Sequence, residues 1–99
     1  MAQYDVFSYP QKDLLLLDVQ SNVLDALQSR VVIPLVPISK EFPGMRGLNP
    51  VLKINDKDYL LSTQDMAGVS TKVLKRKVAT ANEHRAAINA AIDFLMHGY

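Results

Sequence analysis

The two histidines are the residues best suited to acid–base or metal chemistry in this chain, but their spacing keeps them apart. His84 and His97 fall near opposite ends of one predicted helix, roughly 20 Å apart at the rise of an α-helix. They therefore cannot share a metal ion or a substrate within one chain. We expect His84 to be a surface residue near the start of the helix, and we expect no metal site.

Aspartates offer a second possible chemistry, general acid–base catalysis by paired carboxylates. Several fall at predicted turns, where an aspartate commonly accepts hydrogen bonds from the backbone: Asp13, Asp18, Asp25, Asp56 and Asp58. A carboxylate pair stays open as an alternative. Neither Gly44 nor Gly47 precedes a lysine or a clear helix start, so no phosphate-binding loop is indicated. We expect no catalytic residue and no cofactor.

A short basic stretch is the third chemical feature. It contains Lys72, Lys75, Arg76 and Lys77 and no acidic residue. Such a stretch is typical of a solvated strand edge, where charge discourages aggregation. The alternative is a dock for an acidic peptide.

The C-terminal residues carry the clearest secondary-structure signal. Thr80 and Glu83 form a capping-box pattern, and the apolar residues that follow recur at helical spacing. The pattern predicts a helix from about Ala81 to about His97, with Gly98 at the position where helices often leave through a left-handed turn.

One face of this predicted helix is apolar. Its stripe consists of Ile88, Ala91, Ile92 and Leu95, widened by Ala87, Ala90 and Phe94. Phe94 and Met96 cannot both point inward beside that stripe, so one flank stays apolar and exposed in a monomer. A symmetric homodimer would cover it with one self-complementary patch. We expect the final residues, His97, Gly98 and Tyr99, to be a working surface.

The residues before the helix predict short strands joined by turns. The expected strands are Tyr4–Tyr9, Leu14–Val19, Arg30–Pro37, Val51–Ile54, Tyr59–Leu61 and Thr71–Leu74. The expected turns are Pro10–Asp13, Ser21–Asp25 and Asn55–Asp58. Pro34 and Pro37 cannot donate to a ladder, which places the far end of their strand at an edge or a bulge. Strands followed by one terminal helix favour a small, strongly twisted antiparallel sheet or barrel.

The segment Ser39–Asn49 predicts a mobile loop because it holds two glycines and a proline. Within it, Phe42 and Met45 are apolar residues with no obvious core to join.

Composition predicts one domain over residues 1–99. Hydrophobic residues make up 48% of the chain and the net charge is +1, which gives little support to broad electrostatic binding of nucleic acid or membrane. There is no cysteine, which is compatible with a reducing cytoplasm. No signal peptide and no apolar run long enough to span a bilayer are indicated, so we expect a cytoplasmic protein.

Short segments along the chain carry a family resemblance. They are Asp18–Ser21, Arg30–Leu35, Leu48–Val51, Thr63 with Met66, Ala67 and Val69, and Ala91–Leu95 followed by Gly98. Taken together and in this order, they resemble the CcdB family of bacterial toxins, which poison DNA gyrase. The resemblance implies a mainly β, SH3-like barrel with one C-terminal α-helix, and a two-fold homodimer.

In that family the last three residues of both subunits project together, bind the gyrase A subunit and trap gyrase on cleaved DNA. Carried over by position, this surface is His97, Gly98 and Tyr99, of which only Gly98 matches the Trp-Gly-Ile ending of the best-known member. The resemblance implies a toxin of a toxin–antitoxin pair that is not an enzyme.

It also implies an antitoxin whose disordered, acidic C-terminal segment wraps the toxin and through which the toxin reaches operator DNA. On local chemistry, we expect contacts with this antitoxin at Phe42, Met45, Arg46, Lys72, Lys75 and Arg76.

Two alternatives remain open. The same barrel type hosts messenger-RNA endonucleases, for which Arg30, Arg46 or Arg85 would supply positive charge, although no general base stands out. The substituted tail also fits a degenerate toxin that acts only as an antitoxin-binding co-repressor.

Overall fold

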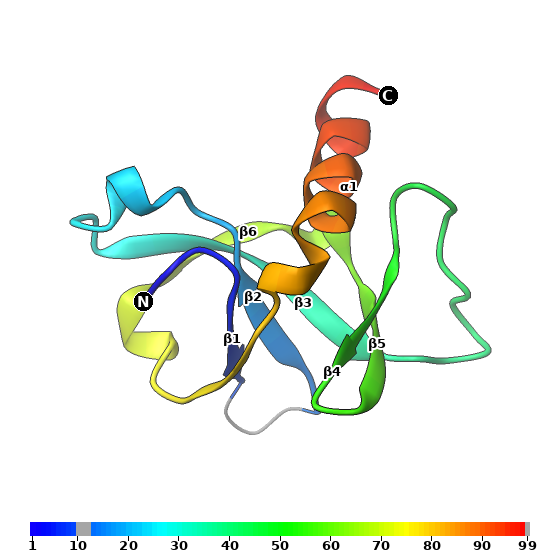
Figure 1. The fold of residues 1–99 in the computed structure, drawn as a ribbon, viewed down its shortest axis with the longest axis horizontal. Helices are drawn as coiled ribbons and strands as arrows, with labels where there is room; N and C mark the ends of the chain where they lie inside the picture. Colours follow the sequence, from blue (N-terminus) through cyan, green and yellow to red (C-terminus); the bar gives the residue numbers. More distant parts are fainter. Residues whose placement is uncertain (10–12, 99) are drawn as a thin grey trace.

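A curled antiparallel sheet with one C-terminal helix forms the molecule in the computed structural model, which describes residues 1–9 and 13–98 (Figure 1). The strands are β1 (Asp5–Ser8), β2 (Leu15–Asp18), β3 (Ser29–Pro37), β4 (Val51–Ile54), β5 (Lys57–Leu61), β6 (Ala67–Ser70) and β7 (Lys77–Thr80). The helix is α1 (Arg85–His97), and short 3₁₀ turns are η1 (Asn22–Leu24), η2 (Thr63–Asp65), η3 (Thr71–Val73) and η4 (Asn82–His84). The mainly β prediction with one C-terminal helix is confirmed.

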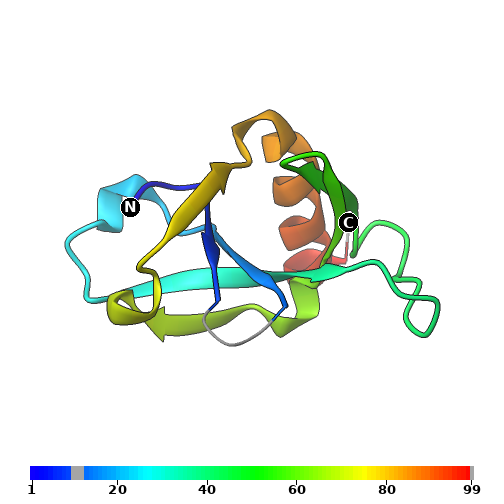
Figure 2. The same ribbon diagram turned by 90° about the horizontal axis from the view of Figure 1, so that it is seen from below.

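The sheet runs in the order β4-β5-β3-β2-β1-β7, with β6 paired to β3. It curls into a half-barrel, so that β7 and the β4–β5 hairpin come to face each other (Figure 2). A side chain joins these two edges: the Asn55 amide in the hairpin turn donates to the carbonyl oxygen of Val78 in β7 at 3.0 Å.

The leucine run in β2 forms a strand because its side chains pack in apolar clusters on both faces of the sheet. Leu17 packs in the larger core cluster, which includes Ile33 and the helix residue Ile88. Leu16 packs in a second cluster with Phe7 and Val32. Alternate side chains of a strand point to opposite faces, so a continuous apolar run marks a strand buried on both sides.

Strand β3 is central in the sheet over most of its length, and its prolines predicted an edge or a bulge at its far end. It pairs with β6 over Ser29–Val32 and with β5 over Leu35–Pro37. Pro34 lies where the neighbour changes, so no ladder hydrogen bond is lost there. The far end fits the prediction, because pairing with β2 ends at Leu35, and Val36 and Pro37 pair with β5 alone.

The strands predicted over Val51–Ile54 and Tyr59–Leu61 form a hairpin of β4 and β5, closed by Ile54 paired to Lys57. The turn is shorter than the predicted Asn55–Asp58, because Lys57 and Asp58 belong to β5. Asn55 and Asp56 both adopt positive φ, 50° and 67°. This is the conformation that a two-residue hairpin turn requires, and asparagine and aspartate tolerate it better than most residues.

The strand predicted over Thr71–Leu74 is wrong. Thr71–Val73 is the 3₁₀ turn η3, and the Ser70 hydroxyl accepts a hydrogen bond from the Lys72 amide at its start. The strands lie on either side of it, as β6 and β7. The turn predicted over Pro10–Asp13 falls mostly outside the described residues.

Candidate functional site

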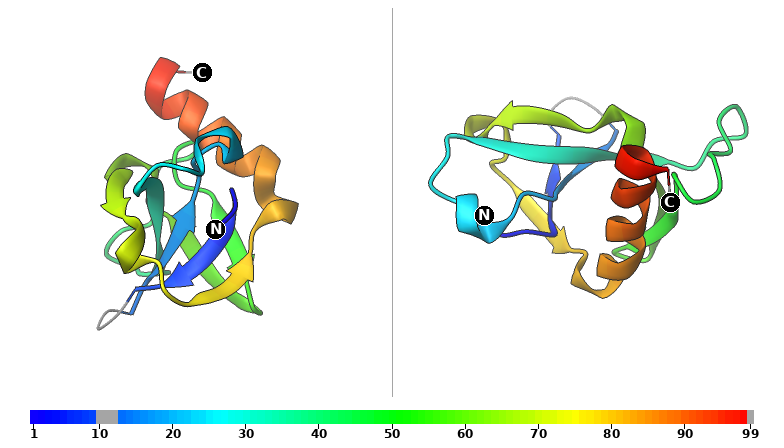
Figure 3. Two further views of the ribbon diagram at one scale, coloured as in Figure 1. Left: turned by 90° about the vertical axis from the view of Figure 1, so that its left-hand side faces the viewer. Right: turned by 90° about the horizontal axis from the view of Figure 1, so that it is seen from above.

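Helix α1 stands on the half-barrel at its base and projects away from it at its carboxyl end (Figures 1 and 3). Ile88 and Ala91 are its fully buried residues. Ile92 and Phe94 are half-buried, whereas Leu95 and Met96 are exposed, Met96 by 64%. The apolar residues of α1 therefore extend beyond the part of the helix that packs against the core.

The start of the helix differs from the predicted capping box. The Thr80 hydroxyl accepts from the backbone and side-chain amides of Asn82, at 3.4 and 3.0 Å, and the turn η4 precedes α1. His84 is half-buried rather than a free surface residue. Its Nε2 lies 3.0 Å from the carbonyl oxygen of Lys53, so the ring ties the helix base to the outer edge of β4.

The end of the helix matches the prediction. Gly98 adopts φ +80°, its amide donates to the Phe94 carbonyl oxygen at 2.9 Å, and the space around its Cα is open. Only glycine takes this left-handed conformation at little cost. His97 and Gly98 are exposed, and Tyr99 lies outside the described residues. Two of the three proposed gyrase-binding residues are thus placed at a projecting tip.

The loop Ser39–Asn49 presents apolar residues on a fixed base. Asn49 is buried, and its side chain accepts from the Met45 amide at 2.9 Å and donates to Leu61 and Gln64. Above this base, Phe42 and Met45 are exposed. The loop therefore offers two apolar side chains to solvent while its root is hydrogen-bonded to the barrel.

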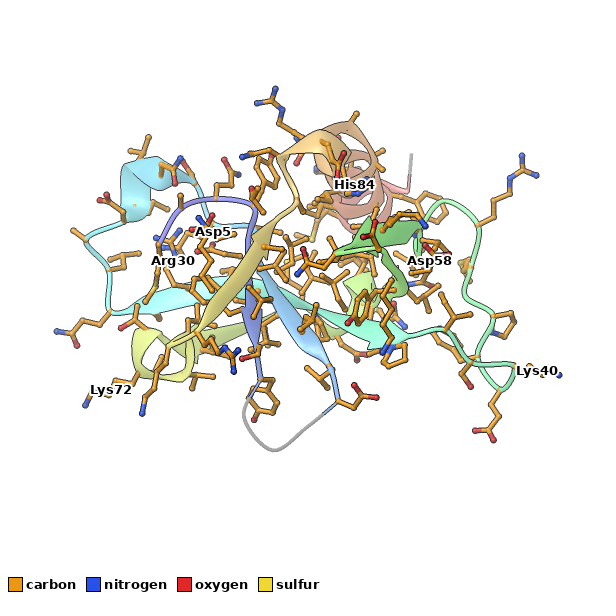
Figure 4. All side chains as sticks on the ribbon, turned by 60° about the horizontal axis from the view of Figure 1, so that its bottom comes forward. Asp5, Arg30, Lys40, Asp58, Lys72 and His84 are labelled. Carbon is orange, nitrogen blue, oxygen red and sulfur yellow. The ribbon has the colours of Figure 1, made fainter. Side chains whose placement is uncertain are left out.

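The basic residues lie at the other end of the molecule. Lys72 belongs to η3, Lys75 and Arg76 follow it, and all three are exposed. Lys77 is paired with Asp5 at 3.2 Å. Figure 4 shows the separation, with Lys40 marking the loop and Lys72 the basic end. The structure therefore does not bring the two expected groups of antitoxin contacts together.

An open groove adjoins the basic end, between the start of β3 and the β6–η3 segment. Its lining residues are Leu27, Gln28, Ser29, Gly68, Val69, Ser70, Thr71 and Lys72. It combines apolar and neutral polar groups with one cation.

Arg30 is unavailable to a surface site. Its side chain is 1% exposed and forms an ion pair with Asp18, with 2.8 Å between Nη2 and Oδ2. Asp18 ends a strand rather than lying in a simple turn, and it also accepts from the Gln20 amide. Burial raises the pKa of Asp18 above its ordinary value, against the opposing hydrogen bonds from Gln20 and Arg30. This removes one of the three arginines considered for an endonuclease.

A surface that sequence reasoning missed lies at η1. Val23 is 88% exposed, and Leu24 and Leu27 are also exposed. Their signal was apolar residues inside a predicted turn. In Figure 1 this turn and the free end of α1 rise on the same side of the sheet.

Among residues 1–9 and 13–98, no cluster of histidine and acidic side chains has the grouping needed to hold a metal ion. No helix in the same residues is long and apolar enough to cross a membrane.

A comparison with known families agrees with this architecture. The family model described as CcdB protein matches residues 3–98, essentially the whole chain. This membership indicates a toxin of a toxin–antitoxin pair, in a family whose members act as gyrase poisons rather than as enzymes. The chain belongs to the CcdB family.

Proposed function

We propose that this protein is a cytoplasmic toxin that binds the gyrase A subunit and traps gyrase on cleaved DNA. The working surface is the paired C-terminal tails of a homodimer, formed by His97, Gly98 and Tyr99 of each subunit. The observation that carries the proposal is the projecting end of α1, where a left-handed glycine follows a helix whose last apolar residues are exposed.

The exposed flank of α1 supports the homodimer. Ala87 and Ala90 are exposed small residues on this flank, whereas the exposed Met96 lies on the other side of the helix. Small side chains allow close approach of a second helix, and a two-fold contact covers both copies of the flank at once. Such a dimer places the two tails beside each other.

The expected antitoxin contacts fall into an apolar group and a basic group. Phe42 and Met45, with Arg46 beside them, offer an apolar contact on an anchored loop. Lys72, Lys75 and Arg76 offer charge to an acidic segment, and the adjoining groove gives that segment a place to lie. The antitoxin, bound in this way, would bring the toxin to operator DNA.

The test is a gyrase cleavage assay with supercoiled DNA, with and without the protein. The proposal expects linear DNA to accumulate when gyrase is denatured in the presence of the toxin. If gyrase is unaffected and the protein still binds its antitoxin, the co-repressor alternative is correct, which the substituted residues His97 and Tyr99 favour. Incubation with mixed RNA tests the endonuclease alternative, since cleavage at defined sites would contradict the proposal.

A further inference from the structure

Tyr4 has a backbone conformation that is unusual for a buried aromatic residue. Its φ is +73°, and its side chain is almost fully buried. Among residues 1–9 and 13–98, the other non-glycine residues with positive φ are Asn55 and Asp56, in the hairpin turn. A bulky residue with positive φ is a genuine outlier, and such conformations persist only where the surroundings enforce them.

Three hydrogen bonds to different elements hold Tyr4 in this conformation. Its amide donates to the Asp18 carbonyl oxygen at 2.6 Å, and its carbonyl oxygen accepts from the Ala81 amide at 2.8 Å. Its hydroxyl donates to Oδ1 of Asn89 at 3.1 Å. One residue therefore connects the end of β2, the residue that precedes η4, and the second turn of α1.

The segment before Tyr4 is also held. The Ala2 amide donates to the Asp5 carboxylate at 2.9 Å, and the Asp5 amide donates back to the Ala2 carbonyl oxygen. The Gln3 amide donates to the Asn22 side chain at 2.8 Å. This tight N-terminal turn sets the conformation from which the Tyr4 ring reaches α1.

Packing holds helix α1 near its base, and the Tyr4 hydroxyl adds a hydrogen bond there. Of its thirteen residues only Ile88 and Ala91 are buried. Asn89 to Gly98 spans about 13 Å at 1.5 Å per residue, so a tilt of about 10° at Asn89 displaces the tip by about 2 Å. A misplacement of that size is enough to spoil a fitted interface.

We propose that Tyr4 is a positioning residue for the C-terminal tail: its hydroxyl bond to Asn89 sets the direction in which α1 presents His97 and Gly98. The proposal rests on the proposed function for its effect on gyrase. Its effect on the helix itself is independent of any target.

The experiment compares Tyr4→Phe and Asn89→Ala with Tyr9→Phe, which removes a hydroxyl at the other end of β1. For each full-length variant, the affinity for the isolated gyrase A subunit and the ¹⁵N order parameters of the α1 amides are measured. We expect Tyr4→Phe and Asn89→Ala each to weaken binding about three- to tenfold, the range for one lost hydrogen bond. We expect lower order parameters over residues 90–97, and a double variant no worse than either single one. Tyr9→Phe should change neither quantity.

A lower melting temperature for Tyr4→Phe with unchanged order parameters and affinity would overturn the proposal, because the hydroxyl would then be only structural. Additive losses in the double variant would also overturn it. If the wild-type protein does not bind gyrase A, the proposed function fails, and the order parameters alone decide the role of Tyr4.

Discussion

The two halves of α1 share one apolar stripe but differ in what covers it. In the first half, Ile88 and Ala91 are completely buried against the half-barrel. In the second half, Leu95 and Met96 continue the apolar pattern into solvent. The base of this helix therefore contributes to stability, whereas its free end is available for recognition.

The largest expected effect is at the base. Ile88→Ala removes a fully buried side chain, and we expect a loss of about 2–5 kcal/mol in the free energy of unfolding. Met96→Ala at the free end should change it by less than about 0.5 kcal/mol. Urea unfolding of both variants makes the comparison. Equal losses would mean that the free end also packs, for example in a dimer interface.

For gyrase binding, in contrast to stability, the free end of α1 should matter most. Deletion of Gly98 and Tyr99 should weaken binding to gyrase A at least tenfold, about 1.4 kcal/mol, and abolish growth inhibition. The dimer should be unchanged and the free energy of unfolding should fall by no more than about 1 kcal/mol, because Gly98 is exposed and contributes one backbone hydrogen bond to the helix end. Undiminished toxicity of the deleted protein would separate function from this end of the helix.

Two glycines offer a matched pair that sharpens the same contrast. A Cβ added at either Gly98 or Gly68 meets nothing within 4 Å, but only Gly98 has positive φ. Gly98→Ala should therefore cost about 1 kcal/mol or fray the last turn of α1, while Gly68→Ala should be neutral or slightly stabilising. Amide hydrogen exchange of residues 94–98, with urea unfolding, measures both effects. Similar results for the two variants would show that the left-handed exit is unimportant.

At the basic end, neutralisation should affect the antitoxin rather than gyrase. Replacing Lys72, Lys75 and Arg76 with glutamine should lower antitoxin affinity about three- to fivefold at low salt, and less at high salt. The control replaces Lys53, Lys57 and Arg85, which are exposed cations elsewhere. Titration calorimetry at two salt concentrations measures the difference. An equal loss in the control would indicate a general charge effect and not a docking site.

The smallest expected effect is a pH dependence from Asp18. Because burial raises its pKa above 3.8 in the folded state, the folded protein holds this proton to higher pH than the unfolded chain does. The stability from this group is therefore full below pH 3.8 and is lost as pH rises through the folded-state pKa. The stability difference between wild type and Asp18→Asn should shrink over this range. A difference that grows with pH would show that the Arg30 ion pair outweighs burial.

Turns and helix ends could be predicted from the sequence because the residues within them determine their backbone conformation. Asn55 and Asp56 marked the hairpin because few other residues accept two successive positive φ angles, and Gly98 marked the helix end for the same reason. Thr71–Val73 was mistaken for a strand because β-branched residues favour strands. The Ser70 hydroxyl and the Lys72 amide instead start a 3₁₀ turn there.

Long-range pairing explains what the sequence could not show. Arg30 was a candidate for surface chemistry, yet pairing of β2 with β3 brings Asp18 against it and buries both. The opposite placement of the Phe42 loop and the Lys72 end depends on the whole strand order. The role of Tyr4 depends on contacts with residues 14, 77 and 85 positions away, Asp18, Ala81 and Asn89, which no local pattern encodes.

Photo-cross-linking from two sides of the molecule shows whether the free end of α1 is the surface that contacts the gyrase A subunit. Benzoylphenylalanine is placed at Met96, near the free end of α1, or at Asp56, in the hairpin turn on the opposite side of the half-barrel (Figure 1). We expect an adduct with the gyrase A subunit from position 96 and none from position 56. An adduct from position 56 alone, or equal adducts from both, would contradict that expectation.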